Sequence, residues 1–303
     1  MRKLLLPLLV CSGAAFAQPT SPQALALLRW YPGIATGATF PTVHNPNAAA
    51  FDGFCVWVVG QSGITKLRTS DGSYTLFQNS GWNLYGAAYD GAYMWVTNWT
   101  GNTVMKLRGS DGAVMGTYPA GVGPTGIVFD GANIWVSNIF DNTVMKYRAS
   151  DGMKLGKFTV PGPYGMAFDG THIWVASYNL GVAKLSSDGT ILGSYSTGSF
   201  NNAGVAFDGT NIWVGTGTGV AKFLASDGTN LANIPVAGST QWLVFDGANI
   251  WVTQQVTHSV TKLRASDGAN LGSFNVGNYP AVPAFDGANI WVPGNTSDNV
   301  SKL

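Results

Sequence analysis

The sequence predicts an all-β protein, a β-propeller of seven blades with four antiparallel strands in each blade. The first observation behind this prediction is a motif, Phe-Asp-Gly-Ala-Asn-Ile-Trp-Val at 129–136, that recurs seven times with small edits. Its tryptophans are 38, 40, 39, 39, 38 and 40 residues apart, and a period of about 40 residues is typical of repeat architectures. The other two observations are the four strand patterns within each repeat and a spare strand near the N-terminus. The motif tryptophans are Trp57, Trp95, Trp135, Trp174, Trp213, Trp251 and Trp291.

The repeat at 124–163 shows why four strands are expected. Apolar segments at 126–129, 134–137, 143–148 and 155–160 are rich in β-branched and aromatic residues, which favour strands. Asp-Gly dipeptides separate the first strand from the second and the third from the fourth, and they are strong turn signals. Four short antiparallel strands in every repeat are the pattern of a propeller blade.

The N-terminal part of the chain is expected to complete the last blade. The last repeat stops on its third strand at 300–303, and no fourth strand follows it. Residues 27–32 align with 114–119, the fourth strand of a complete repeat. We therefore expect Leu28 to Tyr31 to add as the outer strand of the last blade, which would remove an exposed sheet edge.

The first residues have the pattern of a cleaved secretory signal. Two basic residues precede an apolar run at 4–10, and small residues follow up to Ala17. The apolar run is shorter than the roughly 20 residues that span a bilayer, and no later transmembrane segment is expected. The sequence thus divides into a signal at 1–17 and a propeller at 18–303. It predicts an exported protein that is periplasmic, on the cell surface or extracellular.

The charged residues exclude several classes of function. Without the two basic residues of the signal, the 16 lysines and arginines fall to 14, against 15 aspartates. Nucleic-acid binding requires a basic surface, so no nucleic acid is expected as a partner. The chain has no glutamate, and all its aspartates except Asp141 and Asp298 lie in two repeated turns. Few carboxylates remain for acid–base chemistry, and neither a cofactor nor a metal site is predicted. The turn aspartates are Asp52, Asp90, Asp130, Asp169, Asp208, Asp246 and Asp286, and then Asp71, Asp111, Asp151, Asp188, Asp227 and Asp267.

The repeated tryptophans and lysines are interpreted as structural. A buried aromatic side chain hides roughly 150–250 Å², which stabilises the fold by at most about 4–6 kcal/mol. Each third strand carries one lysine, and we expect these lysines to pair with the motif aspartates while their apolar stems lie along the neighbouring sheet. The alternative is a ring of cations that binds an anion. The lysines are Lys66, Lys106, Lys146, Lys184, Lys222, Lys262 and Lys302.

The repeats also resemble a known family. Ile-Trp-Val-Ser-Asn at 134–138, Asn-Thr-Val at 142–144 and Gly-Lys-Phe at 156–158 resemble the YVTN-type β-propeller repeat, over essentially the whole chain after the signal. The layout is also similar to the virginiamycin B lyase (streptogramin lyase) group of seven-bladed propellers. The first resemblance implies an exported binding or surface protein. The second implies a lyase with a catalytic His and Glu and a magnesium ion, but this chain has no glutamate to take that role.

The loops that differ between repeats are the expected place of recognition. The two repeated turns lie on one face of a four-stranded meander, and the variable loops lie on the other, where binding residues concentrate. Amide side chains on this face, among them Asn98, Asn138, Gln241 and Gln254, are interleaved with aromatic ones. This combination suits a neutral polar ligand such as a glycan, or a protein surface. The predicted ligand-binding residues are Trp82, Tyr85, Trp99, Phe140, Tyr164, Tyr178, Phe200, Trp242 and Tyr279.

Trp242 differs from its counterparts in the other repeats. The residue three before the motif's Phe or Tyr opens the innermost strand, where small side chains leave a central channel. We interpret the large Trp242 ring as a filler of the channel mouth, with a stacking surface for a ligand as the alternative. The residues at this position are Ala48, Gly86, Gly126, Gly165, Gly204, Trp242 and Val282.

Together these features predict a monomeric, non-catalytic binding module that recognises a polar small molecule, a glycan or a protein. The alternative is a lyase or hydrolase related to the streptogramin lyases that uses histidine on the variable face, with or without a metal. Its candidate general base is His258 paired with Asp298, and it requires a pocket where His44 or His258 meets Asp298 or Asp141. His172 occupies a repeated turn and is interpreted as structural. A purely structural envelope protein is the third possibility.

Overall fold

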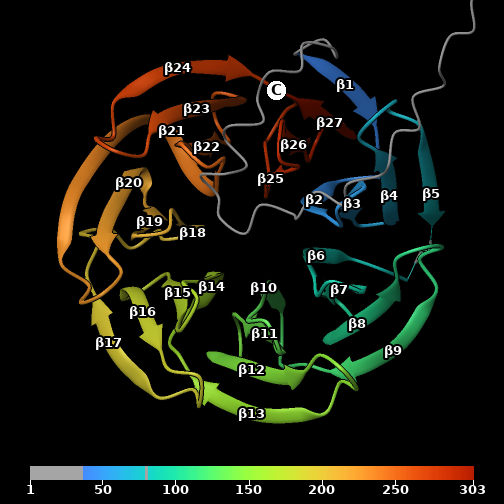
Figure 1. Cartoon of the computed structure of the whole chain (residues 1–303), viewed down its shortest axis with the longest axis horizontal. Helices are drawn as coiled ribbons and strands as arrows, with labels where there is room; N and C mark the ends of the chain where they lie inside the picture. Colours follow the sequence, from blue (N-terminus) through green and yellow to red (C-terminus); the bar gives the residue numbers. More distant parts are fainter. Residues whose placement is uncertain (1–36, 79–80) are drawn as a thin grey trace, which may run out of the picture.

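The computed structural model describes residues 37–78 and 81–303, and within them it has 27 β-strands and no helix. The sheets are arranged in a ring around a central axis, and each runs from an inner strand to an outer strand (Figure 1). The expected all-β fold of repeated four-stranded antiparallel sheets is therefore confirmed.

Among the described residues, five of the six sheets have four antiparallel strands, and in four of these the strands follow one another in the sequence. The first two are β2 (Pro46–Phe51), β3 (Cys55–Gly60), β4 (Gly63–Arg68) and β5 (Tyr74–Gln78), then β6 (Leu84–Tyr89), β7 (Tyr93–Asn98), β8 (Thr103–Arg108) and β9 (Val114–Pro119). The next two are β10 (Pro124–Phe129), β11 (Asn133–Asn138), β12 (Thr143–Arg148) and β13 (Lys154–Thr159), then β14 (Pro163–Phe168), β15 (Ile173–Ser177), β16 (Gly181–Leu185) and β17 (Ile191–Tyr195). The last is β25 (Ala284–Phe285), β26 (Ile290–Gly294), β27 (Asn299–Lys302) and β1 (Ala38–Pro41).

The sixth sheet has seven strands because one strand is shared. Its β21 is 16 residues long; the first part pairs with β20 and the last part with β22. β21 thus continues through the point where the other repeats have a linker between an outer strand and the next inner strand. The strands are β18 (Val205–Phe207), β19 (Asn211–Gly215), β20 (Gly217–Leu224), β21 (Asn230–Phe245), β22 (Asn249–Gln254), β23 (Ser259–Arg264) and β24 (Asn270–Asn275).

The closing strand lies at a different place from the one expected. β27 pairs with β1, with Phe40 opposite Val300, so Ala38–Pro41 is the outer strand; residues 28–31 lie outside the described residues. Two local features explain this register. Four residues separate Pro41 from Pro46, as four separate Pro119 from Pro124, and Phe40 packs on Trp291 at 5.6 Å as Tyr118 packs on Trp95 at 5.5 Å.

The motif aspartate organises its turn and anchors the tryptophan. Asp130 Oδ1 accepts the backbone N–H groups of Ala132 and Asn133, and its Oδ2 accepts the indole N–H of Trp135 at 2.7 Å. The same indole bond forms in all seven repeats at 2.7–2.8 Å. The tryptophans are buried, so the motif is structural.

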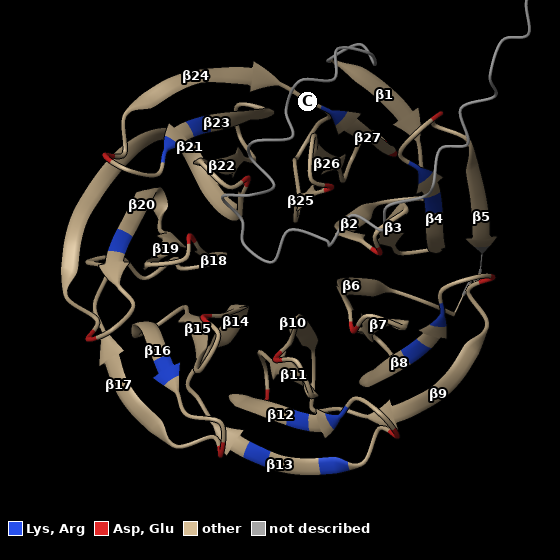
Figure 2. Ribbon diagram, viewed as in Figure 1, with Lys and Arg blue, Asp and Glu red and all other residues tan. Residues whose placement is uncertain are grey.

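The repeated lysines stabilise junctions between sheets rather than one anion site. Each ammonium group lies 4.7–5.3 Å from the ring centroid of the tryptophan in its own repeat, within cation–π range. Lys106 also donates to the carbonyl groups of Ala149 and Ser150 in the next sheet. The expected pairing with the motif aspartates is wrong as a general rule, because within the described residues only Lys66 reaches one, Asp52, at 3.8 Å. The lysines are spread around the ring (Figure 2).

Candidate functional site

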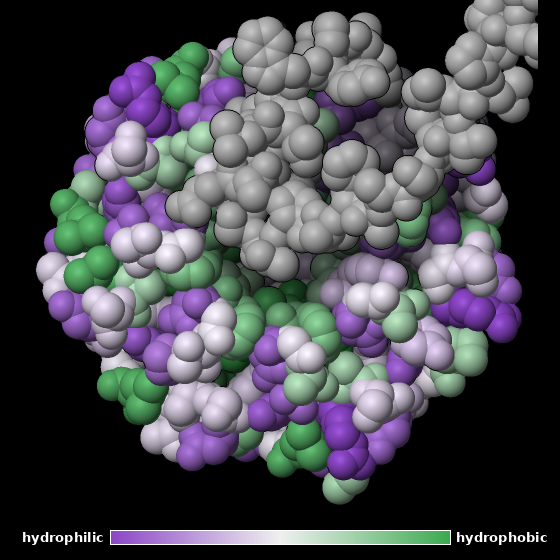
Figure 3. All heavy atoms as spheres, viewed as in Figure 1, coloured by the Kyte–Doolittle hydropathy of each residue, from purple (hydrophilic) through white to green (hydrophobic). Residues whose placement is uncertain are grey.

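Six of the nine predicted ligand-binding residues meet at the centre of the variable face. They come from loops and inner strands of different sheets and form a continuous cluster of ring contacts with centroids 5.0–6.4 Å apart. We call this group the aromatic cluster. Figure 3 views the ring along its axis, and hydrophobic residues surround the centre of the face that it shows, beside the region that grey atoms cover. The aromatic cluster consists of Tyr85, Trp99, Phe140, Tyr164, Tyr178 and Trp242.

Trp242 closes the mouth of the central channel. Its ring stacks on Tyr164 with centroids 5.0 Å apart, and only 7% of the residue is exposed. Below it lies a cavity of about 70 Å³, which is lined by Tyr85, Trp242, Val282 and other inner-strand residues. These contacts favour the filler interpretation of Trp242, because most of its surface is used against the protein itself.

Glycine is required at the equivalent position of the neighbouring inner strands. A Cβ at Gly126 would overlap the carbonyl oxygen of Tyr164, and one at Gly165 would overlap that of Ala203. The inner strands therefore approach one another closely, and the Trp242 ring occupies the space that remains at the axis.

Two phenols form the base of the aromatic cluster. The hydroxyl groups of Tyr85 and Tyr164 are hydrogen-bonded to each other. Burial raises the pKa of both phenols, and for Tyr164 the nearby Tyr85 raises it further. Burial also raises the pKa of Tyr178, with a further contribution from Tyr279. The phenols therefore stay neutral and can act as hydrogen-bond donors and acceptors at ordinary pH.

The cluster also has an accessible part. Phe140 is 63% exposed and makes an edge contact with Trp99 at 5.3 Å, and both rings lie toward the solvent side of the cluster. Tyr178, at the other side of Tyr164, is partly exposed. Trp99, Phe140 and Tyr178 are therefore members of the aromatic cluster that solvent reaches.

The other three predicted residues are not part of this cluster. Trp82 packs against the core that contains Trp57 and Leu84. Phe200 is 82% exposed, and within the described residues it makes no ring contact. Tyr279 is 46% exposed and is close enough to influence the phenols electrostatically.

Several of the interleaved amides are not available to a ligand. Asn98, Asn138, Gln241 and Gln254 are buried. Asn138 accepts the N–H of Gly121 and donates within its own loop, and Gln254 is bonded to neighbouring hydroxyl groups. Their role is to shape loops, because each satisfies polar groups that would otherwise be buried without a partner.

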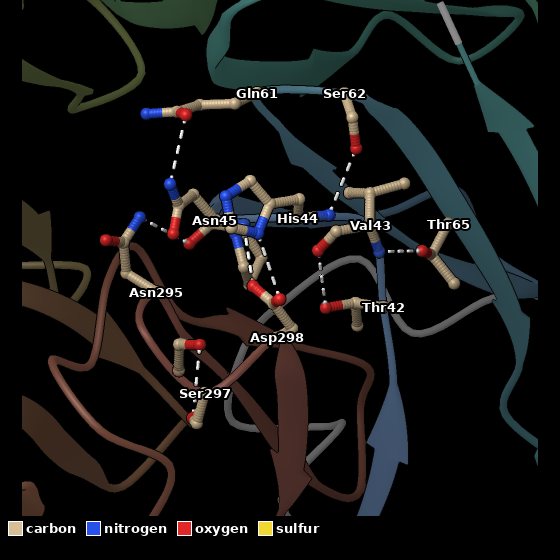
Figure 4. A network of polar contacts seen from close by, with 12 residues as sticks. Thr42, Val43, His44, Asn45, Gln61, Ser62, Thr65, Asn295, Ser297 and Asp298 are labelled. Atoms are coloured by element: carbon tan, nitrogen blue, oxygen red, sulfur yellow. Dashed lines mark hydrogen bonds and ion pairs between the residues drawn. The ribbon is translucent and has the colours of Figure 1, made fainter.

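The histidine pairing differs from the one expected. His44 Nδ1 lies 3.0 Å from Asp298 Oδ2, and Asn45 N–H donates to the other oxygen at 2.8 Å (Figure 4). His258, which the sequence paired with Asp298, instead accepts the backbone N–H of Tyr279 at its Nδ1. The prediction failed because residues 42–45 of the loop between β1 and β2 lie against Asp298 in the loop between β26 and β27, a contact between the two ends of the chain.

The His44–Asp298 pair lies on the surface and not in a pocket. The exposed fractions of the two side chains are 63% and 46%. Burial raises the pKa of Asp298, but the hydrogen bonds from His44 and Asn45 outweigh this effect and hold it below its usual value. Asp141 pairs with Lys157 at 3.4 Å instead of with a histidine. Within residues 37–78 and 81–303, no group of three or more metal-ligating side chains could hold an ion.

His172 is structural, as expected. Its backbone N–H and its ring both contact Asp169, the motif aspartate of its turn. Over the described residues, no helix is long and apolar enough to cross a membrane.

Comparisons with known proteins identify the architecture. The structure is similar to that of a streptogramin B lyase, with a TM-score of 0.75 and 17% identity over 88% of this chain and 96% of the lyase chain. It is also similar to the WD40 β-propeller domain of Doa1 (TM-score 0.75, 12% identity, 90% and 97% covered) and to Kuenenia stuttgartiensis hydrazine synthase (0.73, 15%, 89% and 99%). The fold is a β-propeller. No protein-family model and no curated protein matches the sequence.

Proposed function

We propose that the propeller has seven blades. The seven-stranded sheet would count as two blades if β21 is divided into an outer strand that pairs with β20 and an inner strand that pairs with β22. With the five four-stranded sheets this gives one blade for each copy of the motif.

The function that we propose is recognition of a neutral, polar, glycan-like ligand by a non-catalytic, exported module. The observation that carries the proposal is the aromatic cluster, which gathers rings from four sheets on the face where the repeats differ. Aromatic faces stack well on the apolar faces of sugar rings, and phenol groups supply hydrogen bonds. On the described part of this face, Asp141 is paired with Lys157 and Asp298 is hydrogen-bonded to His44, which favours an uncharged ligand.

A panel of neutral and acidic oligosaccharides, read by thermal shift and tryptophan fluorescence, tests this proposal. We expect a neutral member to bind, and Trp99→Ala or Phe140→Ala to weaken binding about ten-fold, as for an aromatic residue at the centre of a binding surface. Phe200→Ala is the matched control, because Phe200 is exposed on the same face outside the cluster. Equal loss in the control would place the ligand elsewhere. Failure of all oligosaccharides would leave a protein as the partner of this face.

The alternative, a lyase or hydrolase, is favoured by one observation, the His44–Asp298 pair. An imidazole held by a carboxylate can serve as a general base, but this pair is exposed. Incubation with a streptogramin B antibiotic tests the alternative directly. We expect no turnover; turnover that disappears in His44→Ala would replace the binding proposal with a catalytic one.

Export and monomeric state complete the proposal. The N-terminal pattern supports a signal cleaved after Ala17, which N-terminal sequencing of the protein recovered from its host would detect. A periplasmic, cell-surface or extracellular location follows from cleavage. Sedimentation of the mature chain is expected to give a single species of monomer mass.

A further inference from the structure

Four loops on the variable face contain the same hydrogen-bonding position. It is the fourth residue after the second strand of a repeat, and its backbone has a positive φ of 49–52°. Its carbonyl oxygen and its side chain both accept N–H groups of the segment that enters the next sheet. We call it the loop-cap position. Its occupants are Asn102, Asn142, His258 and Asp298.

The geometry is the same for each occupant. Asn102 and Asn142 accept the N–H groups of Gly123 and Gly162 at their side-chain oxygens, at 3.0 and 2.7 Å. His258 accepts Tyr279 N–H at Nδ1, at 3.1 Å. The carbonyl oxygens of Asn142 and His258 accept Val160 and Val276 N–H at 2.9 and 3.0 Å. His258 therefore occupies a position that asparagine or aspartate occupies in the other three loops. Comparison of the loops by residue type alone does not reveal this equivalence.

The occupants differ in one chemical property, their response to protons. An asparagine oxygen remains an acceptor at any physiological pH, whereas imidazole Nδ1 accepts a hydrogen bond only while it carries no proton. Protonation would turn an N–H of His258 toward the N–H of Tyr279. Histidine takes up a proton between about pH 8 and 5, so this loop-cap bond would be lost in a range where its asparagine counterparts are unaffected.

The junction that His258 fastens has fewer other hydrogen bonds than its neighbours. Adjacent inner strands elsewhere are joined by bonds such as Gly165 N–H to Ala203 O and Gly204 N–H to Gln241 O. In the described part of the chain, no such bond joins β21 to β25, and Lys262 donates to no carbonyl of the next sheet as Lys106 does. The linker that leads into β25 is bonded to the closing sheet, where Tyr279 O accepts Asn295 N–H and Ala281 N–H donates to Pro293 O. Its attachment to the preceding sheet therefore depends on the His258 loop cap.

We propose that His258 is an acid-sensitive fastener of the binding face. This role rests on the proposed function: the neutral imidazole ties Tyr279, near the aromatic cluster, to the preceding sheet. Its protonation breaks this tie and loosens this edge of the ligand site, while the bonds of the linker to the closing sheet remain. Tyr279 is the titratable side chain on the segment against His258, and tyrosine does not ionise in this range. On the far side of the closing sheet, His44 faces Asp298. A proton on His44 would strengthen that pair, whereas a proton on His258 would break the bond to Tyr279.

Hydrogen exchange of single amides on the full-length protein tests the proposal without a ligand. Between pH 7.5 and 5.0, after correction for the intrinsic exchange rate, we expect the protection of Tyr279 N–H to fall about five-fold. This factor corresponds to the net free energy of a typical hydrogen bond. The Gly162 amide, capped by Asn142, is the internal control and should change less than two-fold. Equal changes at both amides, or no change at Tyr279, would overturn the proposal.

The variant His258→Asn separates the titration from the structure. It places in this loop the residue that performs the same task at 102 and 142, so the bond should form and its protection should no longer depend on pH. A five-fold fall that persists in His258→Asn would show that another group titrates. If an oligosaccharide binds, its affinity should fall at pH 5.0 in the wild type and hold in the variant; absence of binding at both pH values would count against the proposed function alone.

Discussion

The indole N–H of Trp135 donates a 2.7 Å hydrogen bond to the carboxylate of Asp130, five residues earlier in the chain. The carboxylate also accepts two turn N–H groups, so a single side chain sets the hairpin and fixes the ring that fills the core between sheets. This relationship recurs in each repeat and explains why the aspartate and the tryptophan keep their spacing.

Replacing this aspartate should destabilise the fold. Asp130→Ala leaves a buried indole N–H and two turn N–H groups without an acceptor, so we expect the free energy of unfolding to fall by about 2–3 kcal/mol. Urea denaturation measures the change. Asp141→Ala is the matched control, because its exposed pairing with Lys157 should contribute less than about 1 kcal/mol. Equal losses in the two variants would contradict a special role of the motif aspartate.

The same carboxylates predict loss of stability in acid. Burial raises the pKa of Asp130, Asp169 and Asp246, but hydrogen bonds from the indole and the turn outweigh it, and the net pKa is lowered. A lowered pKa in the folded state means that the contribution is complete above the ordinary aspartate pKa, near 4, and is lost as pH falls below it. Denaturation at a series of pH values should show a steep decline below about pH 4. Asp130→Asn should have a shallower decline; an unchanged slope would contradict the assignment.

Trp242 should be more important for stability than for ligand contact. Trp242→Ala removes a ring that is 93% buried against Tyr164 and its neighbours, and we expect a loss of about 3 kcal/mol. Trp242→Phe should lose about 1 kcal/mol and keep ligand binding. Unfolding and binding are measured on the same preparations. Intact stability with lost binding in Trp242→Ala would make this ring a ligand platform instead of a filler.

Phe40 is expected to hold the closing strand. It packs with Trp291 and Val300 between β1 and β27, so Phe40→Ala should lose about 2–3 kcal/mol and increase hydrogen exchange in β27. Phe200→Ala removes the same side chain from an exposed site and should change stability by less than about 0.5 kcal/mol. Unchanged exchange in β27 would mean that the closing strand does not depend on Phe40.

The architecture could be predicted because it is repeated, and the site could be predicted only in outline. Seven tryptophans with one period predict repeated sheets, and the alternation of strands and turns in 124–163 predicts the four strands within one or two residues. The closing strand was misplaced because the sequence alignment used only the apolar pattern. It ignored two features of the observed strand, which are the Pro41–Pro46 spacing and the aromatic ring of Phe40.

The site depends on contacts between loops that lie far apart in the sequence. Aromatic residues of variable loops predict the cluster around Tyr164, but no local pattern shows that Trp82 turns into the core. Likewise, the partner of Asp298 is set by ring closure, which brings His44 to it from the other end of the chain. Amides such as Asn138 look available in the sequence, yet the folded loop uses them.

The pairing of Phe40 with Val300 also sets the order of events during synthesis. The two residues are 260 positions apart, and chains grow at about 5–20 residues per second. The strand at 38–41 therefore emerges roughly 13–50 s before its partner exists, with its edge open to other chains. Every earlier sheet can form as soon as its own repeat is made, whereas this one is completed last, so the newborn protein is most exposed to aggregation at the sheet that finally closes the ring.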